Sequence, residues 1–94
     1  MIKVSVLYPN EDGANFDMEY YRTTHMEIVG RTMQPTKVEI DHGADGPYMA
    51  MGHLYFDDMD AVATAMGNSG EAMGDIANFT NVTPVAQTSH VVDG

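Results

Sequence analysis

Cysteine and tryptophan are both missing from this sequence of 94 residues. Without cysteine the chain can form no disulfide and has no catalytic thiol. Its stability must come from buried apolar side chains, and a chain of this length buries roughly 60–65% of the surface that its unfolded state exposes. Nine methionines contribute to that apolar surface, and because methionine is unbranched it adapts to irregular spaces.

Basic residues are scarce: 4 Lys and Arg stand against 14 Asp and Glu, which gives a formal net charge of -10. Proteins that bind nucleic acid neutralise phosphates with basic side chains, so the composition speaks against a nucleic-acid partner and against an anionic membrane surface. The acidic balance favours solubility and carries little information about the fold.

Long hydrophobic runs are also lacking. The first apolar stretch begins at Val4, is interrupted by Ser5 and ends at Pro9. It is too short for a secretory signal or a membrane span. We therefore expect no membrane association and a cytoplasmic location.

The segments that are present predict one α+β domain over residues 1–94. Strands are predicted at 2–8, 36–43, 48–56 and 81–92, and helices at 18–32, 59–66 and 70–77. Asp17 is a plausible N-cap of the first helix, with Phe16 and Tyr21 at the spacing of a hydrophobic staple. The order βαββαβ is typical of the ferredoxin-like fold, with a four-stranded antiparallel sheet.

The strand at 48–56 is apolar on both faces, although helices in this fold cover only one face of the sheet. Its alternate side chains are Met49, Met51 and Tyr55 on one side and Ala50, Leu54 and Phe56 on the other. A half-solvated strand should alternate apolar with polar residues. The uncovered face therefore predicts a partner, most simply a second copy in a homodimer; the alternative is a monomer with an apolar back.

The segment FDMEYYRTTHMEIV, residues 16–29, places a histidine on the apolar side of the first helix. At ~100° per residue His25 falls near the centre of an arc that also holds Tyr21 and Ile28. Histidine is suited to proton transfer near neutral pH, so His25 is the candidate catalytic residue. The alternative is a structural histidine at the edge of the core, with both nitrogens satisfied.

Further candidate ligand-binding residues are Tyr8, Tyr21, His53 and Tyr55. A phenol can orient a polar group of a substrate from an apolar wall, and His53 interrupts an apolar strand next to Gly52. The strand position alone leaves open which sheet face His53 occupies.

No two histidines have a close metal-ligand spacing, so no metal site is predicted. The chain also lacks a glycine-rich phosphate loop and any nicotinamide or flavin fingerprint, so no cofactor is predicted.

Three stretches resemble the EthD family: IKVSVLYPNEDGANFDMEYYRTTHM, YMAMGHLYFDDMDA and GDIANFTNVTPVAQTS. The spacings FDxxYY…H and MGHLxF carry the resemblance, which extends over nearly the whole chain. It implies a dimeric α+β barrel, in which two ferredoxin-like sheets join back to back and each subunit keeps a cavity between helices and sheet. His25 and His53 match the family's helix and strand histidines. The segment from 30 to 49 is shorter than in typical relatives, which affects the loops at the cavity mouth.

The resemblance implies a small protein linked to a degradation pathway, because the family is named for ethyl tert-butyl ether breakdown. The leading hypothesis is a cofactor-independent oxidoreductase, monooxygenase or isomerase acting on a small apolar, oxygenated or aromatic molecule, with His25 as proton acceptor or relay. The rival is a non-catalytic ligand-binding or accessory protein. A haem protein with a histidine ligand is a third possibility. Fold alone does not choose among them.

Overall fold

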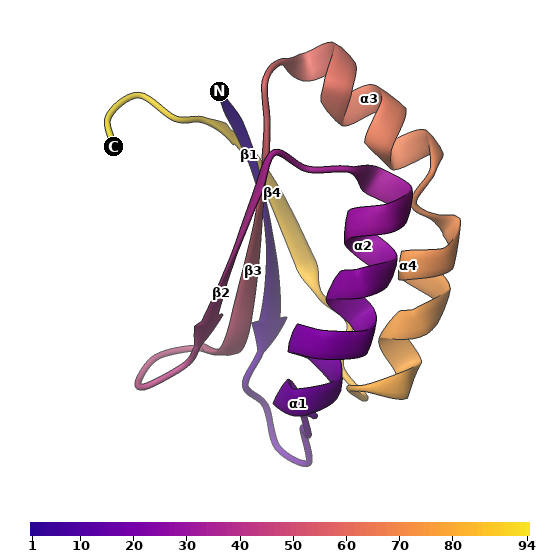
Figure 1. Cartoon of the computed structure of the whole chain (residues 1–94). Helices are drawn as coiled ribbons and strands as arrows, with labels where there is room; N and C mark the ends of the chain where they lie inside the picture. The colour runs from indigo at the N-terminus through magenta and orange to yellow at the C-terminus, as the bar shows by residue number, and fades with distance from the viewer.

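A four-stranded antiparallel sheet with helices on one of its faces forms the protein in the computed structural model, which describes residues 1–94 (Figure 1). The strands are β1 (Ile2–Pro9), β2 (Lys37–His42), β3 (Tyr48–Phe56) and β4 (Val85–His90). Their order across the sheet is β2-β3-β1-β4, which places the two central strands, β1 and β3, side by side. The prediction of an α+β ferredoxin-like fold is confirmed.

Two helical segments connect the strands. The first consists of α1 (Met18–Tyr20), the π-helical turn η1 (Tyr21–His25) and α2 (Met26–Met33). The second consists of α3 (Met59–Gly67), α4 (Gly70–Asp75) and the 3-10 turn η2 (Ile76–Asn78). Both lie against the same face of the sheet, so the opposite face is covered by no element of the chain (Figure 1).

The first helix begins where the sequence predicts. The Asp17 carboxylate accepts a hydrogen bond of 3.0 Å from the Tyr20 amide, and the rings of Phe16 and Tyr21 pack edge to face at 5.0 Å. Gly30 is exposed and leaves the helix intact. The helix ends at Met33, because Gln34 has a left-handed φ of 54° that stops the hydrogen-bond ladder.

The last strand is shorter than predicted: β4 spans Val85–His90 rather than residues 81–92. Proline has no amide hydrogen for a strand ladder, so Pro84 marks a natural start for pairing with β1. The preceding residues instead tie this segment to the start of the first helix. The Thr80 hydroxyl donates to the Asn15 carbonyl, and Phe79 and Val82 enter the core.

The core has two parts, one at each end of the sheet. One is aliphatic and gathers Ile28 and Val29 of α2 against Leu54 and Phe56 of β3. The other is aromatic; its rings, at centroid distances of 5.0–5.6 Å, are those of Tyr8, Phe16, Tyr21 and Phe79. Edge-to-face rings of this kind pack tightly and hold their orientations.

The face of β3 that each side chain occupies follows from the burial pattern. Ala50, Gly52, Leu54 and Phe56 are buried under the helices. Met51, His53 and Tyr55 lie on the uncovered face, opposite Asp41, Glu39 and Lys37 of β2. Cross-strand partners in an antiparallel sheet share a face, so the uncovered face combines apolar with charged side chains.

Candidate active site

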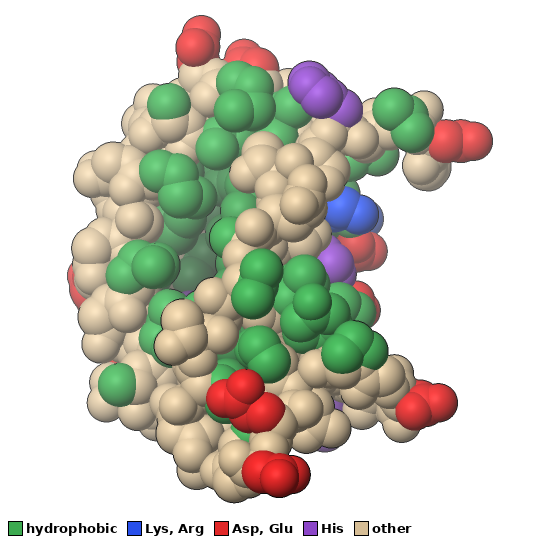
Figure 2. All heavy atoms as spheres, turned by 180° about the vertical axis from the view of Figure 1, so that it is seen from behind, with side chains coloured by type: hydrophobic (Ala, Val, Ile, Leu, Met, Phe, Trp, Pro, Cys, Tyr) green, Lys and Arg blue, Asp and Glu red, His purple; other side chains and the backbone are tan.

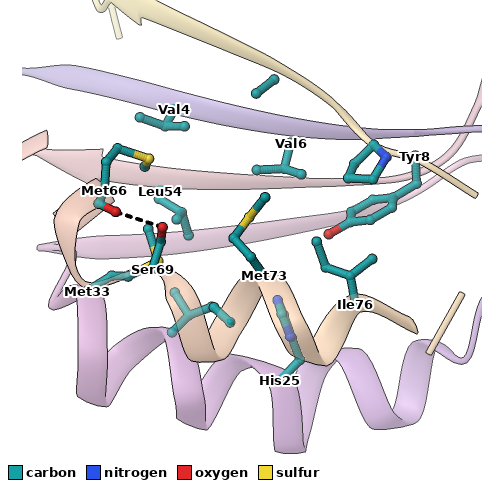
Figure 3. A pocket seen from close by; sticks show the side chains of 14 residues that line it. Val4, Val6, Tyr8, His25, Met33, Leu54, Met66, Ser69, Met73 and Ile76 are labelled. Atoms are coloured by element: carbon teal, nitrogen blue, oxygen red, sulfur yellow. Dashed lines mark hydrogen bonds between the residues drawn. The ribbon is translucent and has the colours of Figure 1, made fainter. Parts of the chain in front are cut away.

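A cavity of about 190 Å³ lies between the helices and the sheet. Figure 3 shows side chains from β1, β3, the first helix and α4 converging on it. Its walls are mostly hydrophobic; they are Val4, Val6, Tyr8, His25, Val29, Met33, Leu54, Met66, Ser69, Ala72, Met73, Ile76, Pro84 and Ala86. Met66 and Met73 are 43% and 62% exposed, so the mouth lies beside them, and a hollow rimmed by hydrophobic side chains is visible from that side (Figure 2).

His25 reaches the cavity from a local irregularity of the first helix. At Tyr21–His25 the helix widens into a π turn, in which the amide of Met26 donates to the Tyr21 carbonyl. The rings of Tyr21 and His25 stack at 5.3 Å with an interplanar angle of 16°. Single π turns occur frequently at functional sites, and this one carries the candidate catalytic side chain.

Asp75, the last residue of α4, is the partner of His25. The distance from His25 Nδ1 to Asp75 Oδ2 is 2.9 Å, and the two residues are only 5% and 7% exposed. The other carboxylate oxygen, Oδ1, accepts hydrogen bonds from the Tyr20 hydroxyl at 2.7 Å and from the Asn78 amide at 2.8 Å. Three side chains, two from the first helix and one from η2, therefore fix this one carboxylate.

The same contacts set the charge of Asp75. Burial acts to raise the pKa of its carboxyl, but the hydrogen bonds from Asn78, Tyr20 and His25 outweigh burial and hold the pKa below its ordinary value. An ionised carboxylate only accepts hydrogen bonds, so Nδ1 of His25 must carry a proton. In a neutral imidazole Nε2 then has the free lone pair. No protein group bonds Nε2, and the ring points into the cavity (Figure 3).

Tyr8 forms a second polar point in the cavity wall. Burial raises the pKa of Tyr8 to about 12, with a hydrogen bond from Tyr21 acting in the opposite direction. Its hydroxyl is therefore neutral at physiological pH and available as a donor. Tyr21 itself does not line the cavity; its hydroxyl packs over Gly52, where a Cβ would overlap it. The space that Gly52 leaves is thus used by Tyr21 on the helix side.

His53 and Tyr55 are not brought to the cavity, because both lie on the uncovered sheet face. His53 bonds Ser5 Oγ through Nδ1 and Asp41 through Nε2, each at 2.8 Å. The Tyr55 hydroxyl donates to Glu39 at 2.5 Å. Hydrolases also use a Ser–His–Asp chain. Here, however, Ser5 is buried in a central strand and does not line the cavity, which fits a structural network.

Sequence reasoning missed Asp75. Its signal is present in the sequence: Ala72, Asp75, Ile76 and Phe79 follow helical spacing, so a carboxylate stands on an otherwise apolar face. A charged group at such a position is expected to have a partner.

The structure contains no group of three or more histidine, aspartate or glutamate side chains that could hold a metal ion. None of the helices has the length and apolar character needed to cross a membrane.

Fold and site together define a ferredoxin-like α+β protein with an apolar cavity and a buried histidine–aspartate pair. The structure of an EthD-like protein from Ralstonia eutropha JMP134 is 36% identical, with a TM-score of 0.90, and the match covers 98% of this chain and 92% of that one. The chain belongs to the EthD-like family. An ethyl tert-butyl ether degradation (EthD) family protein from Bacillus halodurans C-125 shares the fold at 18% identity and a TM-score of 0.62, covering 93% of this chain and 98% of that one. No family model and no curated protein matches the chain.

Proposed function

We propose that this protein binds a small, mainly apolar molecule in its cavity and removes a proton from it with His25. The observation that carries the proposal is the buried pair: Asp75 holds Nδ1, and Nε2 faces an apolar space large enough for a ligand. This arrangement is that of a general base with an orienting carboxylate.

The reaction class is proton abstraction. When Nε2 accepts a proton, the imidazolium is stabilised by the Asp75 carboxylate 2.9 Å from Nδ1, and the negative charge left on the ligand is stabilised by a hydrogen bond from Tyr8. A general base of this kind contributes about 10²- to 10⁴-fold to a rate. Isomerisation uses such a carbanion or enolate directly and needs no electron acceptor.

Hydrogen–deuterium exchange on model compounds tests this function. A panel of small ketones and phenols is incubated with the protein in D₂O, and NMR follows hydrogens on carbons next to the oxygen-bearing carbon. Exchange accelerated by the wild type, lost in His25→Ala and kept in His42→Ala supports the proposal, since His42 is exposed. Ligand binding without accelerated exchange instead supports the rival, a binding or accessory protein.

We further propose that two copies pair through the uncovered sheet face. Leu7, Met51 and Val85 stand on adjacent strands of that face, and Val85 is half exposed. Lys37 and Glu39 lie on the same face, so a two-fold axis can bring lysines of one copy near carboxylates of the other. Apolar strips with complementary charges favour a self-complementary interface.

A further inference from the structure

We infer that the ligand of this cavity is a neutral O–H acid carried on a single apolar ring: a phenol or the enol of a cyclic ketone. His25 and Tyr8 act on the same oxygen of that ligand. The inference rests on the proposed function and adds the chemical class of the ligand to it.

The size of the cavity selects one ring. A dry, apolar cavity of roughly 150 Å³ is known to accommodate benzene. The present cavity, at about 190 Å³, holds a six-membered ring with one or two small substituents. Methionines at the mouth, Met66 and Met73, adapt to such substituents.

The charge of the site selects a neutral ligand. None of the four basic residues lines the cavity. Lys3 and Lys37 lie opposite Tyr55 on the uncovered sheet face, Arg22 is paired with Glu19, and Arg31 is paired with Glu71 and Glu27. The charge that a residue of the cavity wall contacts directly is negative: His25 bonds the Asp75 carboxylate. An ionised carboxylate bound there would lose its water shell with no cation to replace it.

The polar atoms of the wall select a hydroxyl. In the neutral imidazole Nε2 of His25 is an acceptor, so its ligand partner must donate. The Tyr8 hydroxyl is a donor, so its partner must accept. A single O–H group does both. A protonated amine can donate to His25 but cannot accept from Tyr8. Ser69, the remaining hydroxyl of the wall, already donates to the Met66 carbonyl at 2.7 Å (Figure 3).

The step is a proton transfer within a hydrogen bond. The O–H bond of the ligand breaks, its proton moves to Nε2, and the electron pair stays on the ligand oxygen. That oxyanion then accepts from the Tyr8 hydroxyl and from the new Nε2–H, while Nδ1–H remains on Asp75. The net charge of the site is unchanged, because the positive imidazolium and the negative oxyanion appear together.

Three probes of similar size test the class: 4-nitrophenol, 4-nitroanisole and 4-nitrobenzoate. Binding is measured by equilibrium dialysis, and the yellow phenolate band reports proton transfer. We expect 4-nitrophenol to bind about tenfold more tightly than 4-nitroanisole, the worth of one good hydrogen bond, and 4-nitrobenzoate to bind more weakly still. The free dye changes from phenolate to phenol as the pH falls. In the complex this change should occur at a pH about one unit or more lower.

Variants separate this inference from the proposed function. Tyr8→Phe should remove most of the phenolate shift, and Tyr55→Phe on the opposite sheet face is the matched control that should keep it. A complex in which 4-nitrophenol binds with its free titration range, or in which 4-nitrobenzoate binds as well as 4-nitrophenol, overturns the inference while exchange on other ligands can still stand. If none of the probes binds and no ketone exchanges, the proposed function itself fails.

Discussion

His25 and Asp75 are 50 positions apart in the sequence, and in the folded protein their side chains meet at 2.9 Å beneath the surface. The pair joins the first helix to the end of α4 across one wall of the cavity. It gives the histidine a fixed tautomer and gives the buried carboxylate a partner, so structure and chemistry depend on the same contact.

Asp75→Asn should lower activity more than it changes the fold. The amide fits the same space but presents no carboxylate to Nδ1, so the imidazolium that forms during proton transfer loses its stabilising charge. We expect the exchange rate to fall by about 10²-fold or more. NMR exchange measures the rate, with Asp60→Asn on the exposed side of α3 as control. Full activity of Asp75→Asn would show that the carboxylate does not assist His25.

Acid stability should report the lowered pKa of Asp75. A carboxyl with a depressed pKa in the folded state stabilises that state above its ordinary pKa of 3.8, and the contribution is lost as the pH falls through the lower folded value. Urea unfolding of the wild type and of Asp75→Asn should therefore differ at pH 6 and converge below about pH 4. A difference that stays constant over this range would contradict the assignment.

Ionisation of Tyr8 at alkaline pH should destabilise the folded state. The pKa of Tyr8 is raised from 10.0 to about 12, so its contribution to stability is complete below pH 10 and is lost as the pH rises toward about 12. Ultraviolet titration of the native protein should show Tyr8 ionising well above the tyrosines of the urea-unfolded chain. Burial also raises the pKa of Tyr21, so Tyr8→Phe should reduce the late absorbance change by the contribution of one tyrosine. An unchanged late step in that variant would contradict the burial argument.

Ile28→Ala and His25→Ala should separate packing from chemistry. Ile28 is buried in the aliphatic core, and its truncation should cost about 2–5 kcal/mol of unfolding free energy while leaving the exchange reaction in place. His25→Ala should cost about 1–3 kcal/mol, because Asp75 keeps its bonds to Tyr20 and Asn78 but loses one donor. Thermal unfolding beside the exchange assay measures both. Equal losses of stability, with exchange surviving in His25→Ala, would make the histidine structural.

Met51→Glu should split the proposed homodimer. Met51 lies on the uncovered sheet face, so an unpaired carboxylate there would be buried in the interface at a cost of several kcal/mol. Light scattering should find the wild type as a dimer at micromolar concentration and Met51→Glu as a monomer. Met59→Glu, on an exposed position of α3, is the control and should remain dimeric. A monomeric wild type would end the proposal.

Local patterns predicted the elements because their causes are local. The Asp17 cap, the Phe16–Tyr21 staple and the apolar arc around His25 lie within one short segment, and the structure bears out each of them. The bounds were harder to predict where tertiary contacts compete. Residues 81–84 do not belong to β4, because the segment before it is bonded to the start of the first helix. The π turn at Tyr21–His25 does not change the spacing of apolar residues, so the sequence pattern does not predict it.

The sequence by itself determined the order of the elements, the inward position of His25 and the two-sided character of β3, because hydrophobic spacing and capping act between near neighbours. Only the tertiary structure decided that Asp75 meets His25, that Tyr8 shares the cavity wall and that His53 and Tyr55 do not. The reason is register: a strand side chain changes face when its pairing slips by one residue, and long-range packing fixes the pairing. A contact across 50 positions depends on that packing, which no short segment of the chain contains.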